Sequence, residues 1–181
     1  MIHNIYTLAR KSNYRNAGLF LLFNTLLVVS VAAQTPPTYP RMAGYMGIVH
    51  PLVTFSEEGT TTNFKDAYVV GFPTGLNLWK TPKIGFSVEI VPTIRAEKGV
   101  SKVSNLLIHP GILLGLGKGF TFAGRVAFET AGRYGVTPVL NKAFKRNNNG
   151  GNYFIAIPIP VRFGNDKPAS VTLGFQFGIG F

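Results

Sequence analysis

The sequence predicts an all-β fold, a transmembrane antiparallel up-and-down β-barrel, and three observations support this prediction. Apolar residues alternate with small or polar residues along most of the chain after residue 34. Charged residues make up only 14% of the chain, against roughly 25% in an ordinary soluble domain. The first 33 residues have the layout of a secretory signal peptide. A length of 181 residues is enough for one domain and such a segment.

The N-terminal segment predicts export. Residues 1–16 carry only positive charge, and residues 17–33 form an apolar run that ends in small residues. We therefore expect cleavage between Ala33 and Gln34. An uncleaved membrane anchor is the alternative, but the run is at the short limit for crossing about 30 Å of hydrocarbon. The predicted organisation is a signal peptide over 1–33, a linker over 34–40 and a barrel over 41–181.

The last twelve residues show the clearest two-residue period. One face is apolar and the other is small or polar, which is the pattern of a two-faced strand. Similar alternation predicts strands within 84–95, 103–116, 120–129 and 152–163. Segments 44–55 and 67–79 are rich in β-forming residues but less regular. Pro158 and Pro160 are awkward inside a strand, because each removes a ladder hydrogen bond.

These segments give seven strands, whereas a single-chain bacterial barrel has an even number. Parity therefore predicts an eighth strand over Val136–Phe144, after a tight turn at Tyr134-Gly135. With eight strands, the connections at 80–82, 117–119 and 145–151 become periplasmic turns. The connections at 56–66, 96–102 and 164–169 then lie on the outside.

The polar faces of the predicted strands favour a membrane barrel over a soluble one. A water-facing exterior normally carries many Lys and Glu residues, but this face of the last strand is Ser, Thr, Gly and Gln. Such small side chains suit the crowded interior of an eight-stranded barrel. Tyr68 and Trp79, and likewise Tyr153 and Phe163, stand at opposite ends of predicted strands, as aromatic girdles do. We expect the protein to be located in the outer membrane of a Gram-negative-type bacterium.

The signal peptide and the closing strand SVTLGFQFGIGF resemble those of the small outer-membrane β-barrels typified by OmpX and the membrane domain of OmpA. The resemblance covers residues 41–181 in pattern. It implies that a terminal strand with alternating aromatics is recognised by the barrel-assembly machinery. The implied assembly contacts are Phe175, Phe177, Ile179 and Phe181.

Charged residues on the inward faces predict a polar network in the lumen. Its members are Glu89, Arg95, Arg125, Glu129, Arg133 and Arg162. Charges in a narrow lumen must pair or cost several kcal/mol each, so we expect a plugged barrel rather than a conducting pore. The alternative, a solute path lined by arginines, needs a wider barrel.

Enzyme chemistry has little support in the sequence. Cysteine is absent, and the two histidines after residue 34, His50 and His109, are too far apart in the chain to suggest a metal site. Ser104 and His109 with Glu89 or Glu129 form a conceivable hydrolytic set, but no known motif spacing supports it. The net charge of +11 is scattered rather than arranged in a stripe, which disfavours nucleic acid as a partner. We expect no enzyme, no metal and no cofactor.

The expected role is therefore a structural, adhesion or envelope-maintenance barrel. Its expected partners are outer-membrane lipid, lipopolysaccharide and the barrel-assembly machinery. Two alternatives remain: a barrel that binds or transports lipid or small solutes, and a lipid-modifying hydrolase.

Overall fold

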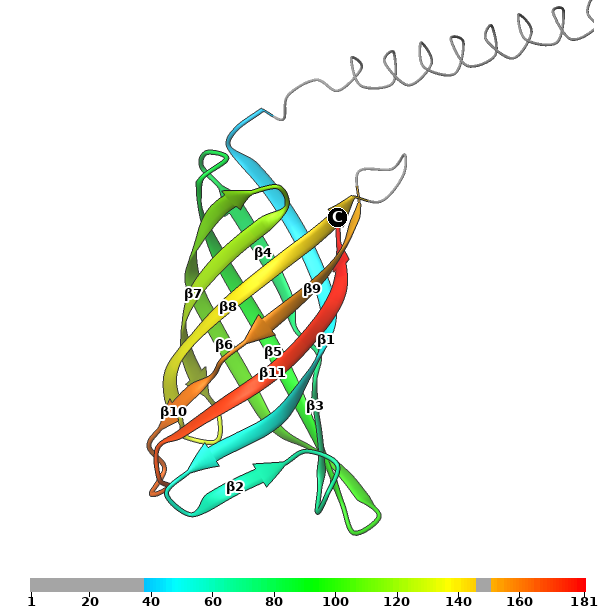
Figure 1. Cartoon of the computed structure of the whole chain (residues 1–181), viewed down its shortest axis with the longest axis vertical. Coiled ribbons are helices and arrows are strands. Elements are labelled where there is room, and N and C mark those ends of the chain that lie inside the picture. Colours follow the sequence, from blue (N-terminus) through cyan, green and yellow to red (C-terminus); the bar gives the residue numbers. More distant parts are fainter. Residues whose placement is uncertain (1–37, 146–150) are drawn as a thin grey trace, which may run out of the picture. The chain divides into compact units, whose positions relative to one another are not determined.

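The computed structural model describes residues 38–145 and 151–181, and all its regular elements are strands. The strands are β1 (Arg41–Ser56), β2 (Gly59–Thr62), β3 (Tyr68–Gly71), β4 (Thr74–Trp79), β5 (Ile84–Glu97), β6 (Val100–Gly117), β7 (Phe120–Glu129), β8 (Tyr134–Lys145), β9 (Asn152–Pro158), β10 (Val161–Phe163) and β11 (Ser170–Gly180). Figure 1 shows them as one tilted antiparallel sheet wound into a barrel. The prediction of an all-β fold is confirmed.

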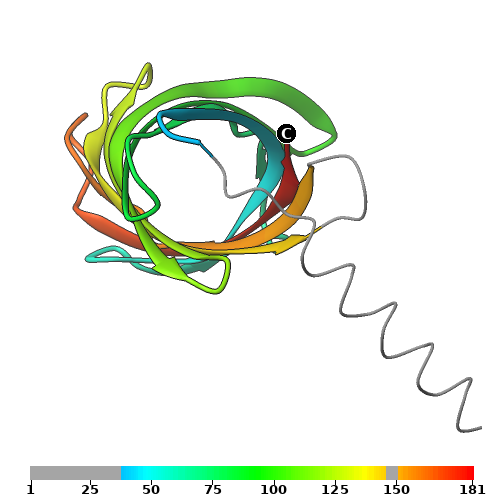
Figure 2. The same cartoon turned by 90° about the horizontal axis from the view of Figure 1, so that it is seen from above.

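The sheet closes on itself. Each of β5, β6, β7 and β8 pairs with the next strand in the sequence, and β11 pairs with β1 over Tyr45–Ser56. Strands β3 and β4 together fill one position between β1 and β5. Strands β9 and β10 together fill another between β8 and β11. The result is an up-and-down ring of eight hydrogen-bonded positions, seen end-on in Figure 2.

The eighth strand, predicted from parity, is confirmed. Its preceding turn differs from the prediction, because Tyr134 and Gly135 already pair with Phe128 and Ala127. The chain reverses one step earlier, where the Glu129 amide bonds the Arg133 carbonyl and Gly132 adopts a positive φ.

The two ends of the barrel differ in their connections. We call the end with Arg41, the turns at 80–83 and 118–119, and Phe181 the terminal end. We call the other end the loop end; it carries the connections 57–67, 98–99, 130–133 and 164–169. At the loop end β5 and β6 continue through a two-residue turn, Lys98-Gly99, in which both φ angles are positive as in a type I′ hairpin. The first residues of β6 have no partner on β7, so this hairpin extends past its neighbour.

Prolines interrupt the wall at two places. Phe72 and Pro73 separate β3 from β4, and Ile159 and Pro160 separate β9 from β10. Proline has no amide hydrogen to donate to a ladder. The carbonyls of Pro73 and Pro160 still accept bonds from β1 and β11, so the ring stays continuous across each interruption.

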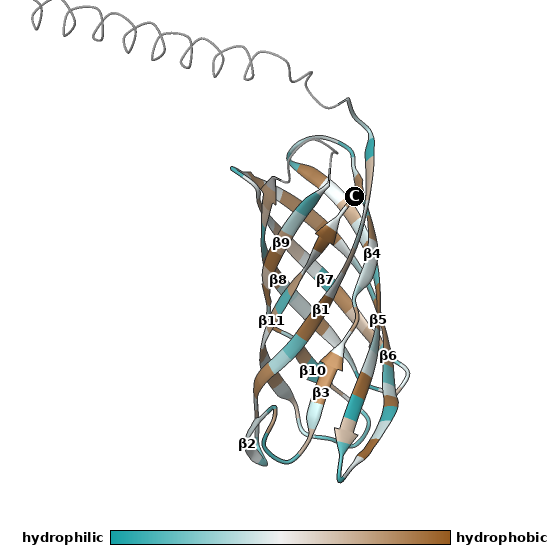
Figure 3. Ribbon diagram, turned by 90° about the vertical axis from the view of Figure 1, so that its right-hand side faces the viewer, coloured by the Kyte–Doolittle hydropathy of each residue, from teal (hydrophilic) through white to brown (hydrophobic). Residues whose placement is uncertain are grey.

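The barrel exterior is apolar. Alternate residues of each long strand face outward and expose large apolar side chains. Figure 3 shows hydrophobic and hydrophilic residues interspersed along the same strands. On β5 these are Ile84, Phe86, Val88 and Ile90; on β11 they are Val171, Leu173, Phe175, Phe177 and Ile179. The intervening residues Ser87, Glu89, Ser170 and Gln176 are buried. An apolar exterior around a polar interior is the arrangement of a transmembrane β-barrel. None of the described residues forms a helix that is long and apolar enough to span a membrane.

Candidate functional site in the barrel lumen

Eight inward-facing side chains from six strands form one hydrogen-bonded group, which we call the lumen network. Its members are Tyr45 (β1), Ser87 and Glu89 (β5), His109 (β6), Arg125 and Glu129 (β7), Thr137 (β8) and Arg162 (β10). Each occupies the inward phase of its strand, because successive side chains alternate between the two faces. Residues distant in the sequence therefore meet across the lumen.

Glu89 is the centre of one half of the lumen network. Its Oε2 accepts the Tyr45 hydroxyl at 2.8 Å, and its Oε1 lies 3.1 Å from His109 Nδ1. The Arg125 guanidinium lies 3.7 Å from the same carboxylate and donates to the Tyr45 hydroxyl at 3.0 Å. Glu89 is only 3% exposed. A buried carboxylate is tolerated when it is paired and its oxygens accept hydrogen bonds, as here.

Arg162 is the centre of the other half. Its Nε donates to Glu129 Oε1 at 2.6 Å, while Nη1 donates to the Thr137 hydroxyl at 3.0 Å and to the Val136 carbonyl at 3.1 Å. Its Nη2 lies 3.2 Å from His109 Nε2. One guanidinium thus connects β10 to β6, β7 and β8.

His109 joins the two halves, and its partners determine its protonation. An ionised carboxylate only accepts hydrogen bonds and a guanidinium only donates them. Nδ1 therefore carries the hydrogen that points to Glu89, and Nε2 accepts from Arg162 or from the Thr137 hydroxyl, 3.0 Å away. The imidazole is neutral in this arrangement. Two carboxylates, Glu89 and Glu129, then balance two guanidiniums, Arg125 and Arg162.

The structure places four of the six predicted lumen residues in this network: Glu89, Arg125, Glu129 and Arg162. Arg133 lies nearby at the loop end, where its guanidinium donates to the carbonyls of Arg162 and Pro168. Arg95 does not reach the lumen network, and its predicted place there is wrong. It lies on the extended β5–β6 hairpin, half exposed, and pairs with Glu97 on its own strand. The alternation identified its phase but could not show where the enclosed part of the barrel ends.

Four members of the lumen network are absent from the predicted set, namely Tyr45, Ser87, His109 and Thr137, and one cavity residue, Trp79, was misplaced. Tyr45 lies in a segment whose facing was not predicted, and Thr137 lies in the weakly patterned eighth strand. Trp79 was assigned to an outer aromatic girdle, but it faces the lumen, in phase with Gly75 and Asn77. The Phe72-Pro73 interruption obscured the period of this segment. Tyr153 and Phe163 do face outward, near opposite ends of the β9–β10 position.

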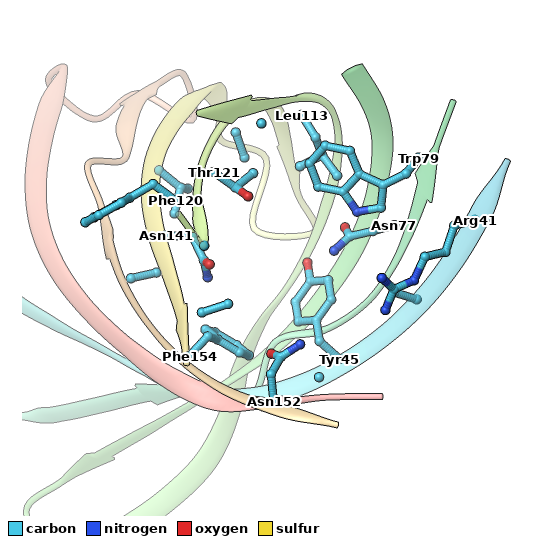
Figure 4. A pocket seen from close by; sticks show the side chains of 18 of the residues that line it. Arg41, Tyr45, Asn77, Trp79, Leu113, Phe120, Thr121, Asn141, Asn152 and Phe154 are labelled. Atoms are coloured by element: carbon cyan, nitrogen blue, oxygen red, sulfur yellow. The ribbon is translucent and has the colours of Figure 1, made fainter. Parts of the chain in front are cut away.

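A cavity of about 320 Å³ lies between the lumen network and the terminal end. Arg125 and Tyr45 belong to both the network and the cavity lining. Figure 4 shows Tyr45, Asn77 and Trp79 opposite Phe120, Asn141 and Phe154. The cavity is therefore a recess whose inner boundary is formed by hydrogen-bonded polar side chains.

The conceivable hydrolytic set does not assemble. Glu89 contacts His109, but the Ser104 hydroxyl lies at an exposed bulge and donates to the Thr93 carbonyl. The hydroxyl beside the imidazole belongs instead to Thr137, which is fully buried and accepts a hydrogen bond from Arg162. Among the described residues, no group of three His, Cys, Asp or Glu side chains could hold a metal ion.

The remaining predicted sites have simple placements. Phe175, Phe177 and Ile179 face outward on β11 and Phe181 follows it, exposed. Their recognition by the barrel-assembly machinery stays a prediction. The cleavage site at Ala33 and Gln34 lies outside the described residues.

Comparisons with known proteins add a likeness of fold only. No protein-family model matches the chain, and no curated protein matches it. One solved structure, from work on the de novo design of transmembrane β-barrels, is similar at 9% identity with a TM-score of 0.46. The alignment covers 81% of this chain and 98% of the designed one.

Proposed function

We propose that this protein is an outer-membrane barrel closed to solutes, with a structural role in the cell envelope. The observation that carries the proposal is the lumen network, which joins six strands across the interior through paired charges. A conducting pore needs a continuous water-filled path, whereas here both carboxylates and both guanidiniums of the network are bonded to one another.

The orientation follows from the same proposal. Short turns and both ends of the barrel domain lie at the terminal end, which therefore faces the periplasm, while the loop end faces outward. At the loop end the connection between β2 and β3 exposes Phe64, and the extended β5–β6 hairpin exposes Val100 and Val103. These side chains are the surface through which a secondary adhesion role would operate. Lys98 and Lys102 on the same hairpin would meet lipopolysaccharide phosphates.

We also propose that the protein is not an enzyme. The only hydroxyl hydrogen-bonded to a His109 ring nitrogen in the described part of the chain is buried and bonded to Arg162. A nucleophile in that position would have to break an existing bond and would have no access to a lipid ester.

Liposome swelling tests closure directly. Proteoliposomes containing the wild-type protein should not swell in small sugars, whereas a general porin incorporated at the same density should cause swelling. The folded state of the variant Glu129→Ala/Arg162→Ala is first checked by heat-modifiability. The folded variant should conduct small ions in planar bilayers. Sugar-permeable wild-type liposomes would overturn the closed-barrel proposal. Recovery of the protein outside the outer-membrane fraction would overturn the location.

A further inference from the structure

The side chains that line the terminal cavity carry charge of one sign. Only Arg41 and Arg125 among them are charged, and both are cationic; Phe181, the last residue of the sequence, adds one main-chain carboxylate to the lining. The surrounding turns add Lys80, Lys83 and Lys118, all exposed. No described acidic residue lies at this end: the acids are at the loop end, apart from Glu89 and Glu129, which are paired in the lumen network.

This arrangement concentrates a positive potential at the cavity mouth. Clefts lined by charge of one sign, with walls of low dielectric constant, focus the field and raise the local concentration of oppositely charged solutes. Arg125 and Glu89 are paired and compensate each other, so the excess positive charge at the mouth comes from Arg41 and the lysines of the surrounding turns. An anion approaching from the terminal end is therefore attracted.

The rest of the lining fits an organic body with a few polar groups. Aromatic and aliphatic surface comes from Trp79, Phe154, Leu113 and Val139, and side-chain amides come from Asn77, Asn141, Asn152 and Gln176. Small-molecule sites typically combine apolar walls with a few placed polar groups. The Asn77 Oδ1 acceptor is buried without a hydrogen-bond partner among the described residues. A volume of about 320 Å³ equals the liquid volume of roughly ten water molecules, which suits a single carboxylated ring.

We infer that the terminal cavity is a binding site for a small organic anion, a carboxylate carried on an apolar or aromatic body. The ligand enters from the terminal end and stops at the lumen network, so the site binds rather than transports. The inference depends on the proposed closed barrel only for the inner boundary of the cavity.

The chain supplies its own reporter, because Trp79 is the single tryptophan of the sequence and lines the cavity. The probe is 4-nitrobenzoate, a nitroaromatic quencher, and the matched neutral probe is 4-nitrobenzamide. Full-chain protein in detergent should show saturable quenching of Trp79 by the carboxylate. Its affinity should exceed that of the amide by about tenfold at low salt, equivalent to about 1.4 kcal/mol, and the preference should shrink at high salt.

Variants locate the site. Arg41→Gln should weaken carboxylate binding several-fold and leave amide binding unchanged, whereas Lys102→Gln at the loop end should change neither. Ala123→Leu should abolish quenching by both probes, because Ala123 is buried in the cavity wall. Ala143→Leu, nearer the mouth, serves the same purpose if Ala123→Leu does not fold.

A control distinguishes binding in the cavity from quenching by probe that has dissolved in the detergent micelle. It moves the single tryptophan from the cavity to the outer face of the barrel. Trp79→Phe/Phe163→Trp places the tryptophan on the outer face, where quenching should be linear and independent of probe charge. Equal affinities for both probes, unchanged binding after cavity filling, or saturable quenching of the outer tryptophan would each overturn the inference. Conductance is measured separately, so a barrel that conducts but binds the anion contradicts only the closed-barrel proposal.

Discussion

Removing the Arg162 side chain should be among the most destabilising single changes in this barrel. In Arg162→Met the Glu129 carboxylate, in a side chain only 14% exposed, loses its guanidinium, and the Thr137 hydroxyl and Val136 carbonyl lose their donor. Breaking a buried ion pair by removing one partner typically costs about 3–5 kcal/mol. We expect a loss of unfolding free energy in that range.

The chain offers a matched control in Arg95→Met. That side chain also pairs with a glutamate, at 2.9 Å, but the two side chains are 44% and 43% exposed. Exposed pairs contribute at most about 1 kcal/mol. Urea titration in detergent, followed by Trp79 fluorescence and by the shift of the unboiled band, measures both variants.

A double-mutant cycle separates the ion pair from the other contacts of Arg162. Glu129→Gln removes the stranded charge, so Glu129→Gln/Arg162→Met should be more stable than the sum of the single losses predicts, with a coupling of about 1–3 kcal/mol. Equal losses for Arg162→Met and Arg95→Met, or additivity in the cycle, would show that the lumen pair does not support the fold as argued.

Three further predictions test the wall and its facing. Val88→Arg should lower the free energy of unfolding by about 2–4 kcal/mol in a lipid bilayer, because Val88 faces outward near the middle of β5. Val103→Arg on the extended hairpin should change it by no more than about 0.5 kcal/mol. Urea midpoints measured in liposomes compare the two variants. Gly178→Val should prevent stable folding, because a Cβ there would collide with the Met46 carbonyl of the neighbouring strand. Gly124→Ala should fold, since the nearest atom to its Cβ lies 3.8 Å away. The heat-modifiable band on a gel reports the folding of both variants. Brominated lipids should quench the lumen-facing Trp79 weakly and the outer tryptophan of Trp79→Phe/Phe163→Trp strongly; strong quenching of Trp79 would place it on the lipid face.

The sequence predicted the barrel well because the strand period is strict wherever one face meets lipid. In β5, β7 and β11 each step along the strand exchanges an apolar exterior for a crowded interior, so a shift by one residue would place Glu89 or Arg125 in lipid. The facing of these charged residues could therefore be derived from pattern alone. Parity then supplied the eighth strand, although its own pattern was weak.

The misplacements share a physical cause. Trp79 follows a proline interruption that obscures the period, and Arg95 has the inward phase but lies beyond the enclosed part of the barrel. The contact between Thr137 and His109 could not be predicted either, because it depends on which strands face each other across the lumen. That is a property of the closed ring, and no local pattern records it.

The lumen network stabilises a part of the wall that a proline interruption weakens. In lipid no water replaces a missing ladder bond, so every strand proline weakens the wall where it stands. The interruption at Ile159-Pro160 leaves β10 only three residues long, with two paired residues on β11 and three on β8. Arg162 is the middle residue of that short strand, and its guanidinium binds Glu129 on β7 as well as Thr137 and the Val136 carbonyl on β8. The interior charges therefore hold in place a strand that the wall alone holds weakly, which is a reason for a barrel of this size to keep a buried ion pair. Opening this network to pass solutes would also loosen the wall, which is a further argument for the proposed closed barrel.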